Sequence, residues 1–382
     1  MVAEVCTPAQ KYSERAQLRR DAQSMIKLQS FSFVKLFTPL FIPARRCMAT
    51  AIAIVLLSGC FGQETVKDSL DNYQGRLSRV LDAPLPETVV SPLPKLTDGS
   101  QLKYNIEGLS INLREFYAIQ DCELGRVVAE RNTSLGKSQL PSQRLVYESK
   151  LLSVFSACEH SLRETDTKLA DRLATWKEAK EADYTQSWAN LIQTSKELRL
   201  GLNSPERLLA SENNKDALAA INSLYFLNEL VSPEALGKSI DSGELETQLK
   251  IILSSRLPAS LWQTQQTLAI TLPKLTESLA PQLNATACPE GRASDTAKIL
   301  RNVFYLFFIE EIQPVGSLVN NYHYKLAPLW EKWLQNPVLH NAFKGYINQH
   351  ANVGFATYSS AMQEHVAMWQ QFLGRCNLSP VA

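Results

Sequence analysis

The sequence predicts an all-α protein, a multi-helix bundle of roughly nine to eleven helices. Apolar residues recur at three- and four-residue steps along most of the chain, which is the pattern of amphipathic helices. The predicted helices follow one another through short connections, as in helical bundles. Only 15 of 382 residues are Gly, which argues against β-rich folds and nucleotide-binding loops. With 45% hydrophobic residues, the chain is too apolar to be disordered.

The first sixty residues are expected to direct export. Residues 1–47 are interpreted as an over-extended gene start or the basic beginning of a signal sequence. Residues 48–59 form a short apolar run that ends in small residues, typical of a secretory signal and too short to span a bilayer. The sequence Leu57-Ser58-Gly59-Cys60 resembles the bacterial lipobox. This resemblance implies cleavage before Cys60 and lipid attachment to its thiol; the alternative is an ordinary buried cysteine.

A lipid at Cys60 predicts a protein that is anchored to a membrane without spanning it. By analogy with lipoprotein sorting, Phe61 in place of Asp favours the outer membrane, with the protein facing the periplasm. The formal charge of +1 gives no reason to expect a nucleic acid partner. Without residues 1–59, which hold eight Lys/Arg and three Asp/Glu, the chain has 31 basic and 35 acidic residues. This mildly acidic body has no electrostatic affinity for anionic lipids.

Residues 60–99 are predicted to hold the lipidated N-terminus, a first helix and a proline-rich linker. The helix is expected over 65–82, where apolar residues have helical spacing. Four prolines between 84 and 94 exclude a helix there and favour an extended segment. Because apolar residues alternate along it, we expect this segment to be a partly packed strap.

Residues 100–382 are predicted to form an all-helical domain, with a sub-boundary near the polar segment 203–214. It opens with one short strand over 102–111, and the segment 167–200 is either one long helix or two. Pro273 and Pro314 are expected to kink or split their helices. A helix is expected over 112–132, where Asn112 and Glu115 form a capping box. The other helices are expected over 142–163, 215–231, 244–256, 259–283, 295–312, 315–335, 338–349 and 354–375.

Four cysteines follow Cys60, an even number that suggests two disulfides in an exported chain. Three pairings exist, and we favour Cys122–Cys158 with Cys288–Cys376 because each pair lies within one half of the chain. Gly125 and Ala129 are expected on the same side of a helix as Cys122, where small side chains would let a neighbouring helix approach. Zinc is the alternative, but no Cys-x-x-Cys occurs, so no metal is expected.

Residues 71–81, the Pro-Leu-Pro segment and residues 120–136 and 141–145 resemble the proteobacterial lipoprotein family known as domain of unknown function 3080. The resemblance extends from the lipobox to the C-terminus and is strongest over 60–160. It implies an exported lipoprotein without an assigned activity, and it supplies no catalytic residues or cofactor.

No catalytic motif is convincing. Ser134 and Lys137 match the Ser-x-x-Lys of penicillin-interacting enzymes and Ser211 and Asn213 match Ser-x-Asn, but Lys-Thr-Gly is missing. The five histidines form no His-x-x-x-His pair, so the chain is expected to be non-catalytic and to need no cofactor. A site assembled from residues distant in sequence stays an alternative.

Fourteen of the 32 aromatic residues lie in 301–382, which predicts an aromatic core or, alternatively, a groove for a lipid, a peptide or a partner helix. The candidate residues for a ligand pocket are Tyr322, His323, Tyr324, Trp330 and Trp333. The alternative for the first three is a helix end with a satisfied histidine.

Arg131 has an apolar helical stripe around it, so its guanidinium needs a carboxylate if it is buried. Glu148 is one candidate partner; alternatively, Arg131 reaches solvent from a frayed helix end.

The sequence thus favours a lipid-anchored cell-envelope protein that acts as a non-catalytic binding or scaffolding module, with an envelope protein as its expected partner. One alternative is a periplasmic carrier with an apolar ligand, otherwise unknown, in an aromatic C-terminal pocket. Another is an envelope hydrolase. A large closed cavity without converging polar groups would favour the carrier and a broad exposed apolar patch the scaffold. A cleft with a strongly shifted carboxylate or histidine pKa would favour the enzyme.

Overall fold

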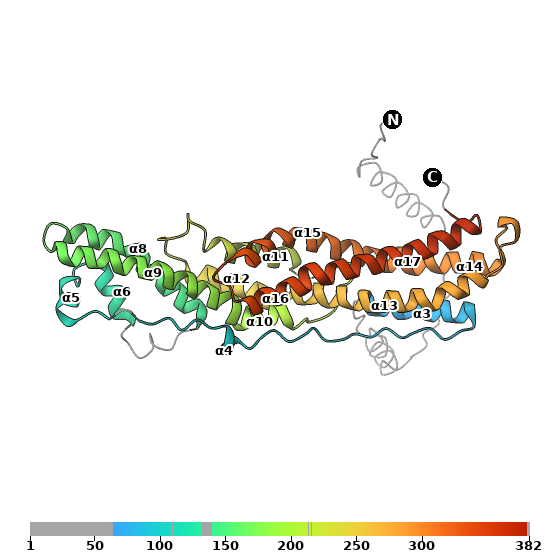
Figure 1. Cartoon of the computed structure of the whole chain (residues 1–382), viewed down its shortest axis with the longest axis horizontal. Coiled ribbons are helices and arrows are strands. Elements are labelled where there is room, and N and C mark those ends of the chain that lie inside the picture. The colour runs from blue at the N-terminus through green and yellow to red at the C-terminus, as the bar shows by residue number, and fades with distance from the viewer. Residues whose placement is uncertain (1–63, 109, 132–139, 213, 215, 380–382) are drawn as a thin grey trace, which may run out of the picture. The chain divides into compact units, whose positions relative to one another are not determined.

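The computed structural model describes residues 64–108, 110–131, 140–212, 214 and 216–379. The prediction of an all-α bundle is confirmed, and these residues contain no strand (Figure 1). The strand expected over 102–111 is therefore wrong. The backbone of Tyr104 instead bonds with the side chain of Asn190, which accepts from Tyr104 N at 2.7 Å and donates to Tyr104 O at 3.0 Å. A side-chain amide thus takes the place that a neighbouring strand would occupy.

Helix α3 (Val66–Leu81) and the strap after it form as the sequence predicts. The helix buries Val66, Leu70, Tyr73 and Leu77 completely. The strap, defined as residues 83–98, has no helix and runs extended in Figure 1.

The strap is bound to the rest of the domain along its length. Leu93 and Leu96 are buried. Gln266 donates to Ser91 O at 2.9 Å, and Asn203 donates to Pro94 O at 2.8 Å. The strap is therefore part of the packed domain and not a free spacer.

The helix expected over 112–132 is in fact two helices, α5 (Leu113–Ala118) and α6 (Glu123–Arg131), which follow the short α4 (Gly99–Leu102). A turn separates them, and it folds back on Gly125. A Cβ at Gly125 would lie 2.4 Å from the carbonyl oxygen of Ile119. The lack of a side chain at Gly125 therefore makes room for this turn and not for another helix. Ala129 is exposed.

Helices α8 (Pro141–Leu162) and α9 (Thr167–Thr194) form a long helical hairpin (Figure 1). Ser195 ends α9 and caps α10 (Lys196–Asn203), so the segment 167–200 contains two helices. Helix α12 (Ser242–Ser255) packs against α10 and α11 (Ala217–Glu229).

Residues 203–214 do not separate two domains, because residues 63–382 form one unit. Leu209 is buried in the loop after α10. Its N–H donates to Thr264 Oγ1 at 2.9 Å, and its carbonyl accepts from Val66 N at 3.1 Å. This polar, turn-rich segment is therefore a loop within one domain, and its backbone forms hydrogen bonds with both α3 and α13.

The C-terminal half consists of α13 (Leu257–Ala285) and two helical stretches. The first is α14 (Asp295–Val303), the π-helix η2 (Phe304–Ile312) and α15 (Gln313–Gln335). The second is α16 (Asn341–Asn348), the π-helix η3 (Gln349–Gly354) and α17 (Phe355–Arg375); the 3-10 turn η1 (Pro289–Gly291) precedes α14. No helix in the described part of the chain is long and apolar enough to cross a membrane.

The prolines do not split these helices. Helix α13 continues through Pro273 and Pro281. Pro314 lies at the start of α15, directly after η2. Since proline lacks an N–H and its ring clashes with the carbonyl four residues earlier, the wider π-helical turn accommodates it without a break.

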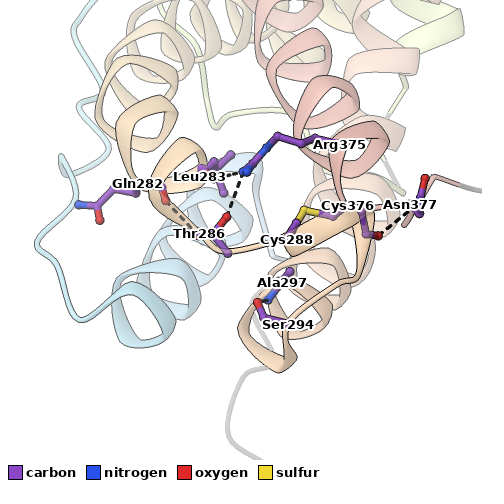
Figure 2. The surroundings of a disulfide bond; sticks show 10 residues. Gln282, Leu283, Thr286, Cys288, Ser294, Ala297, Arg375, Cys376 and Asn377 are labelled. Atoms are coloured by element: carbon purple, nitrogen blue, oxygen red, sulfur yellow. Dashed lines mark hydrogen bonds between the residues drawn. A yellow bond between two sulfur atoms is a disulfide. The ribbon is translucent and has the colours of Figure 1, made fainter.

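Two disulfides join segments distant in sequence, in the pairings that the sequence favours. Cys122 bonds Cys158 and Cys288 bonds Cys376, with Cα–Cα distances of 5.5 and 5.2 Å. Figure 2 shows the second bond between the loop after α13 and the end of α17. Beside it, Arg375 donates to Leu283 O at 2.6 Å. This end of the bundle is therefore closed by a covalent bond and a hydrogen bond.

Candidate ligand-binding site

A buried group of charges lies in the α8–α9 hairpin. Glu148 on α8 is 0% exposed. Its Oε1 lies 2.5 Å from Arg144 Nη2, one turn earlier, and its Oε2 lies 3.4 Å from Lys180 Nζ on α9. Lys180 also lies 2.7 Å from Asp183 Oδ2. Since a buried charge is tolerated only with a partner, these residues hold the two helices in one register.

Arg131, at the end of α6, forms no ion pair with Glu148, its candidate partner, although the charge of Glu148 acts to raise the pKa of Arg131. Its guanidinium lies over the ring of Tyr147, 5.1 Å from the centroid. Burial, and then the charge of Arg144, lower the pKa of Arg131. Burial raises the pKa of Tyr147 to about 12. This arginine is therefore a partly desolvated cation beside an aromatic ring.

A cavity of about 340 Å³ opens between the turn after α5 and helices α6, α8 and α9, and is called the apolar cavity below. Arg131 and Lys180 contribute cationic groups to its lining. Its volume is within the range of small-molecule sites, about 300–1,000 Å³. The walls are mainly apolar and include Ile119, Leu124, Val128, Leu151, Phe155, Leu173 and Trp176.

A second cavity, of about 460 Å³, shares Arg131 with the first and is called the cationic cavity. Four basic residues line it: Lys103, Arg131, Arg144 and Arg199. Ser100, Asn105, Ser187, Asn190 and Thr194 add polar groups, and no Asp or Glu occurs among the described residues of its lining. Because one side chain lines both cavities, they are neighbours. Together they offer apolar walls on one side and cationic groups on the other.

The first disulfide supports a wall of the apolar cavity. Cys122 directly precedes α6, and Cys158 lies on α8, one turn after Phe155. Leu124 and Val128 on α6 face the cavity together with Leu151 and Phe155 on α8. The bond therefore holds two of the walls against each other.

The five residues expected to form a pocket do not converge. His323 stacks on Phe355 with a centroid distance of 3.4 Å, and Tyr324 is 66% exposed. Trp330 and Trp333 are buried in contact with each other. Tyr322 lines a surface pocket beside α11. The aromatic residues of this half are thus mainly core, which was one of the two interpretations of the sequence.

Three buried histidines have low pKa values without an adjacent catalytic group. Burial lowers the pKa of His323 and of His350 to about 4, and that of His365 to about 3. None of the three lines the apolar or the cationic cavity. Their pKa shifts follow from packing and give no support to an enzyme.

Several sequence-based candidates lie outside the described residues: Cys60, Ser134, Lys137 and Asn213. Within the part of the chain that is described, no three His, Cys, Asp or Glu residues are grouped as metal ligands would be.

Comparison with family models matches residues 70–380 to a family described as a protein of unknown function, DUF3080. The chain belongs to the DUF3080 family. No curated protein and no solved structure matches this DUF3080 chain. The family is the one that the sequence resembles, and its description assigns no activity to the cavities.

The sequence does contain a signal for the site of this DUF3080 protein that the initial interpretation missed. On α9, Leu169, Leu173, Trp176, Lys180, Tyr184 and Ser187 follow one another at three- and four-residue steps. Lys180 and Ser187 are thus polar residues on an apolar stripe, and both are buried. Polar residues in such positions indicate partners or ligands inside the protein.

Proposed function

We propose that the protein is a non-catalytic binding protein that holds the apolar part of a small molecule in the apolar cavity. The observation that carries this proposal is the cavity itself, whose apolar side chains come from the turn after α5 and from α6, α8 and α9. The cavity opens to the surface, so a ligand can enter it, and its volume of about 340 Å³ is within the range of small-molecule sites.

The surface supports binding of a small molecule over scaffolding. Among the large apolar side chains that are exposed in the described residues, Val89 and Val90 are consecutive and Leu113 and Tyr117 lie one turn apart on α5. Others belong to separate elements, among them Leu218 on α11, Leu306 on η2 and Val353 on η3. Single exposed apolar residues are normal on soluble proteins. A protein partner that docks through a broad apolar patch is thus less well supported than a ligand inside the cavity.

A variant that fills the cavity tests this proposal. Val128→Trp places a large ring in the cavity. We expect it to lower the affinity of the full-length chain for the apolar fluorescent probe 1-N-phenylnaphthylamine by roughly tenfold or more, because a loss of ~1.4 kcal/mol of binding free energy is a tenfold loss of affinity. Val353→Trp makes the same exchange on the surface and should leave the affinity unchanged. Probe binding that is equal in both variants and in the parent chain contradicts a site in this cavity.

We also propose that the protein is attached to the outer membrane by a lipid on Cys60 and faces the periplasm. The support is the lipobox-like Leu57-Ser58-Gly59-Cys60 after an apolar run, with Phe61 in the following position. A Cys60→Ser variant should lose incorporation of labelled palmitate and should leave the membrane fraction. Cys47→Ser, upstream of the apolar run, is the control and should keep both. Continued labelling of the Cys60→Ser chain would refute the anchor.

A further inference from the structure

We infer that the cationic cavity binds a phosphate-type anion that forms the head group of the ligand whose apolar part occupies the apolar cavity. This inference rests on the proposed function and extends it to the chemical class of the ligand. It is argued from the charges of the cationic cavity, from two buried polar atoms in it, and from its position beside the apolar cavity.

The basic residues of the cationic cavity come from four separate parts of the fold. Lys103 follows α4, Arg131 ends α6, Arg144 belongs to α8 and Arg199 to α10. Among the described lining residues there is no carboxylate. Like charges in one partly buried space repel each other more strongly than in water. An anion in the cavity would therefore stabilise their convergence.

Neutral groups cannot cancel this positive charge. Arg199 Nη1 donates to the carbonyl oxygens of Thr97 at 2.8 Å and Gln193 at 3.4 Å, which bonds that nitrogen but leaves the charge of the guanidinium. Glu148 is the buried carboxylate nearest to Arg144, and it is shared with Lys180. Arg144 and Lys180 thus share the carboxylate of Glu148, and Lys180 also pairs with Asp183.

Two polar atoms of the cavity lining are buried without a hydrogen-bond partner. Ser187 is 1% exposed, and its Oγ bonds to no other group. Arg144 Nε is also buried and unbonded. A buried donor without an acceptor is costly, and such groups normally have a partner in the functional state. The oxygens of a bound anion would accept from both.

Phosphate suits these donors better than a single carboxylate. Guanidinium groups bind phosphate through paired N–H donors, and a phosphate offers more oxygens than a carboxylate to donors from several directions. Since Arg131 lines both cavities, they are close enough for one molecule to place an anion in the cationic cavity and an apolar group in the other. The ligand class is thus an amphiphile with a phosphate-type head.

Titration calorimetry of the full-length chain with three probes tests the inference. Decyl phosphate carries both parts of the inferred ligand, decanol carries the apolar part, and inorganic phosphate carries the anion. We expect decyl phosphate to bind roughly tenfold or more tightly than decanol, because charge-assisted hydrogen bonds add to apolar burial. Inorganic phosphate should bind most weakly, and the preference for decyl phosphate should decrease as salt is added.

Two variants locate the preference. Ser187→Ala removes a buried hydroxyl that has no partner in the protein, and Lys103→Gln removes an exposed charge of the lining. Each should weaken decyl phosphate binding by about three- to tenfold and leave decanol binding unchanged. Lys274→Gln removes an equally exposed charge on α13, away from the lining, and should change neither.

The outcomes separate this inference from the proposed function. Equal binding of decyl phosphate and decanol, or a preference that both lining variants retain, overturns the phosphate site and leaves the apolar cavity as a ligand site. Inorganic phosphate that binds as tightly as decyl phosphate also overturns the inference, since the anion is then not a head group. Binding of no decyl compound contradicts the proposed function itself.

Discussion

Two regions of this bundle bury different kinds of polar group, charged side chains in one and neutral histidines in the other. The hairpin region, defined as α6, α8 and α9, buries the charged residues Glu148 and Lys180 beside two cavities. The C-terminal region, defined as α3 and residues 257–376, buries histidines that are neutral and surrounded by aromatic rings. Both regions are helical, so the difference lies in what their buried faces contain.

His365 shows how the C-terminal region satisfies a buried polar ring. Thr276 donates its hydroxyl to Leu272 O, so its oxygen accepts from Nδ1–H of His365 at 2.8 Å. Nε2 is then the unprotonated nitrogen, and it accepts from Trp369 Nε1 at 3.2 Å and from the Tyr73 hydroxyl at 3.1 Å. Three segments, α3, α13 and α17, are joined through one neutral imidazole.

The two regions differ in where their unpaired buried polar groups lie. In the C-terminal region, rings such as Phe304 and Trp369 stack with centroids 4.7 Å apart, and Phe308 lies beside His365. Such contacts fill the core and stabilise it. Buried polar atoms without partners occur in both regions, among them Trp333 Nε1 in the C-terminal region, but those of Ser187 and Arg144 line a cavity. Buried polar groups left unbonded beside a cavity are typical of sites that bind something.

The largest expected effect is a loss of stability at acidic pH, which tests the C-terminal region. The folded-state pKa is about 4 for His323 and His350 and about 3 for His365, below the ordinary value of 6.5. Between pH 6.5 and the folded-state pKa, each histidine is protonated in the unfolded chain and neutral in the folded chain. The free energy of unfolding therefore has its full value above about pH 6.5 and falls as the pH decreases. At pH 5, each histidine should cost about 2 kcal/mol relative to pH 7.

Thermal unfolding followed by tryptophan fluorescence at pH 7 and pH 5 measures this loss. His350→Phe, which keeps a ring against Trp262, should flatten the pH dependence by about one third, since one of three similar groups no longer titrates. An unchanged pH dependence in this variant would mean that His350 is not buried in neutral form.

The fold was predictable from the sequence because helical periodicity is a local property. Val66, Leu70, Tyr73 and Leu77 lie at three- and four-residue steps and are all buried, so α3 could be predicted from its own residues. The missed break between α5 and α6 depends on the contact of Gly125 with the Ile119 carbonyl. No periodicity shows such a contact.

The candidate site was less predictable because cavities depend on which helices meet. The pairing of Arg144 with Glu148 is an i,i+4 spacing that the sequence contains. Lys180, however, reaches Glu148 only because α8 and α9 pack against each other. The aromatic density of residues 301–382 indicated a core or, alternatively, a groove, and Trp330 and Trp333 lie in the core.

The next largest effect compares the two disulfides, one in each region. The Cys288–Cys376 bond closes a separation of 88 residues and the Cys122–Cys158 bond one of 36. In the chain-entropy model, replacing Cys288 and Cys376 by serines should cost about 4–5 kcal/mol, and replacing Cys122 and Cys158 about 4 kcal/mol. Denaturant unfolding measures both, and mass mapping without reductant checks the pairings in the parent chain.

The two disulfides should differ more in binding than in stability. Loss of Cys122–Cys158 frees the start of α6, which carries Leu124 and Val128, and should weaken binding of 1-N-phenylnaphthylamine. Loss of Cys288–Cys376 is distant from the cavity lining and should not. If both double variants bind the probe equally well, the first bond does not support the cavity.

The next effect concerns Glu148 and tests what the buried charges contribute to the hairpin region. Glu148→Gln keeps the shape of the side chain but leaves Arg144 and Lys180 without their shared carboxylate, which should cost about 3–5 kcal/mol in denaturant unfolding. Glu159→Gln on the same helix is the control. Its pair with Arg163, at 2.6 Å, is partly exposed, so the loss should stay below about 1 kcal/mol.

The same variant separates stability from binding. Removal of the Glu148 carboxylate increases the positive charge beside the cationic cavity, because Arg144 belongs to its lining. Binding of decyl phosphate should then be as tight as in the parent chain or tighter, although the fold is less stable. If affinity and stability fall together instead, the buried charges serve only to hold the hairpin, and the contrast between the two regions is one of packing alone.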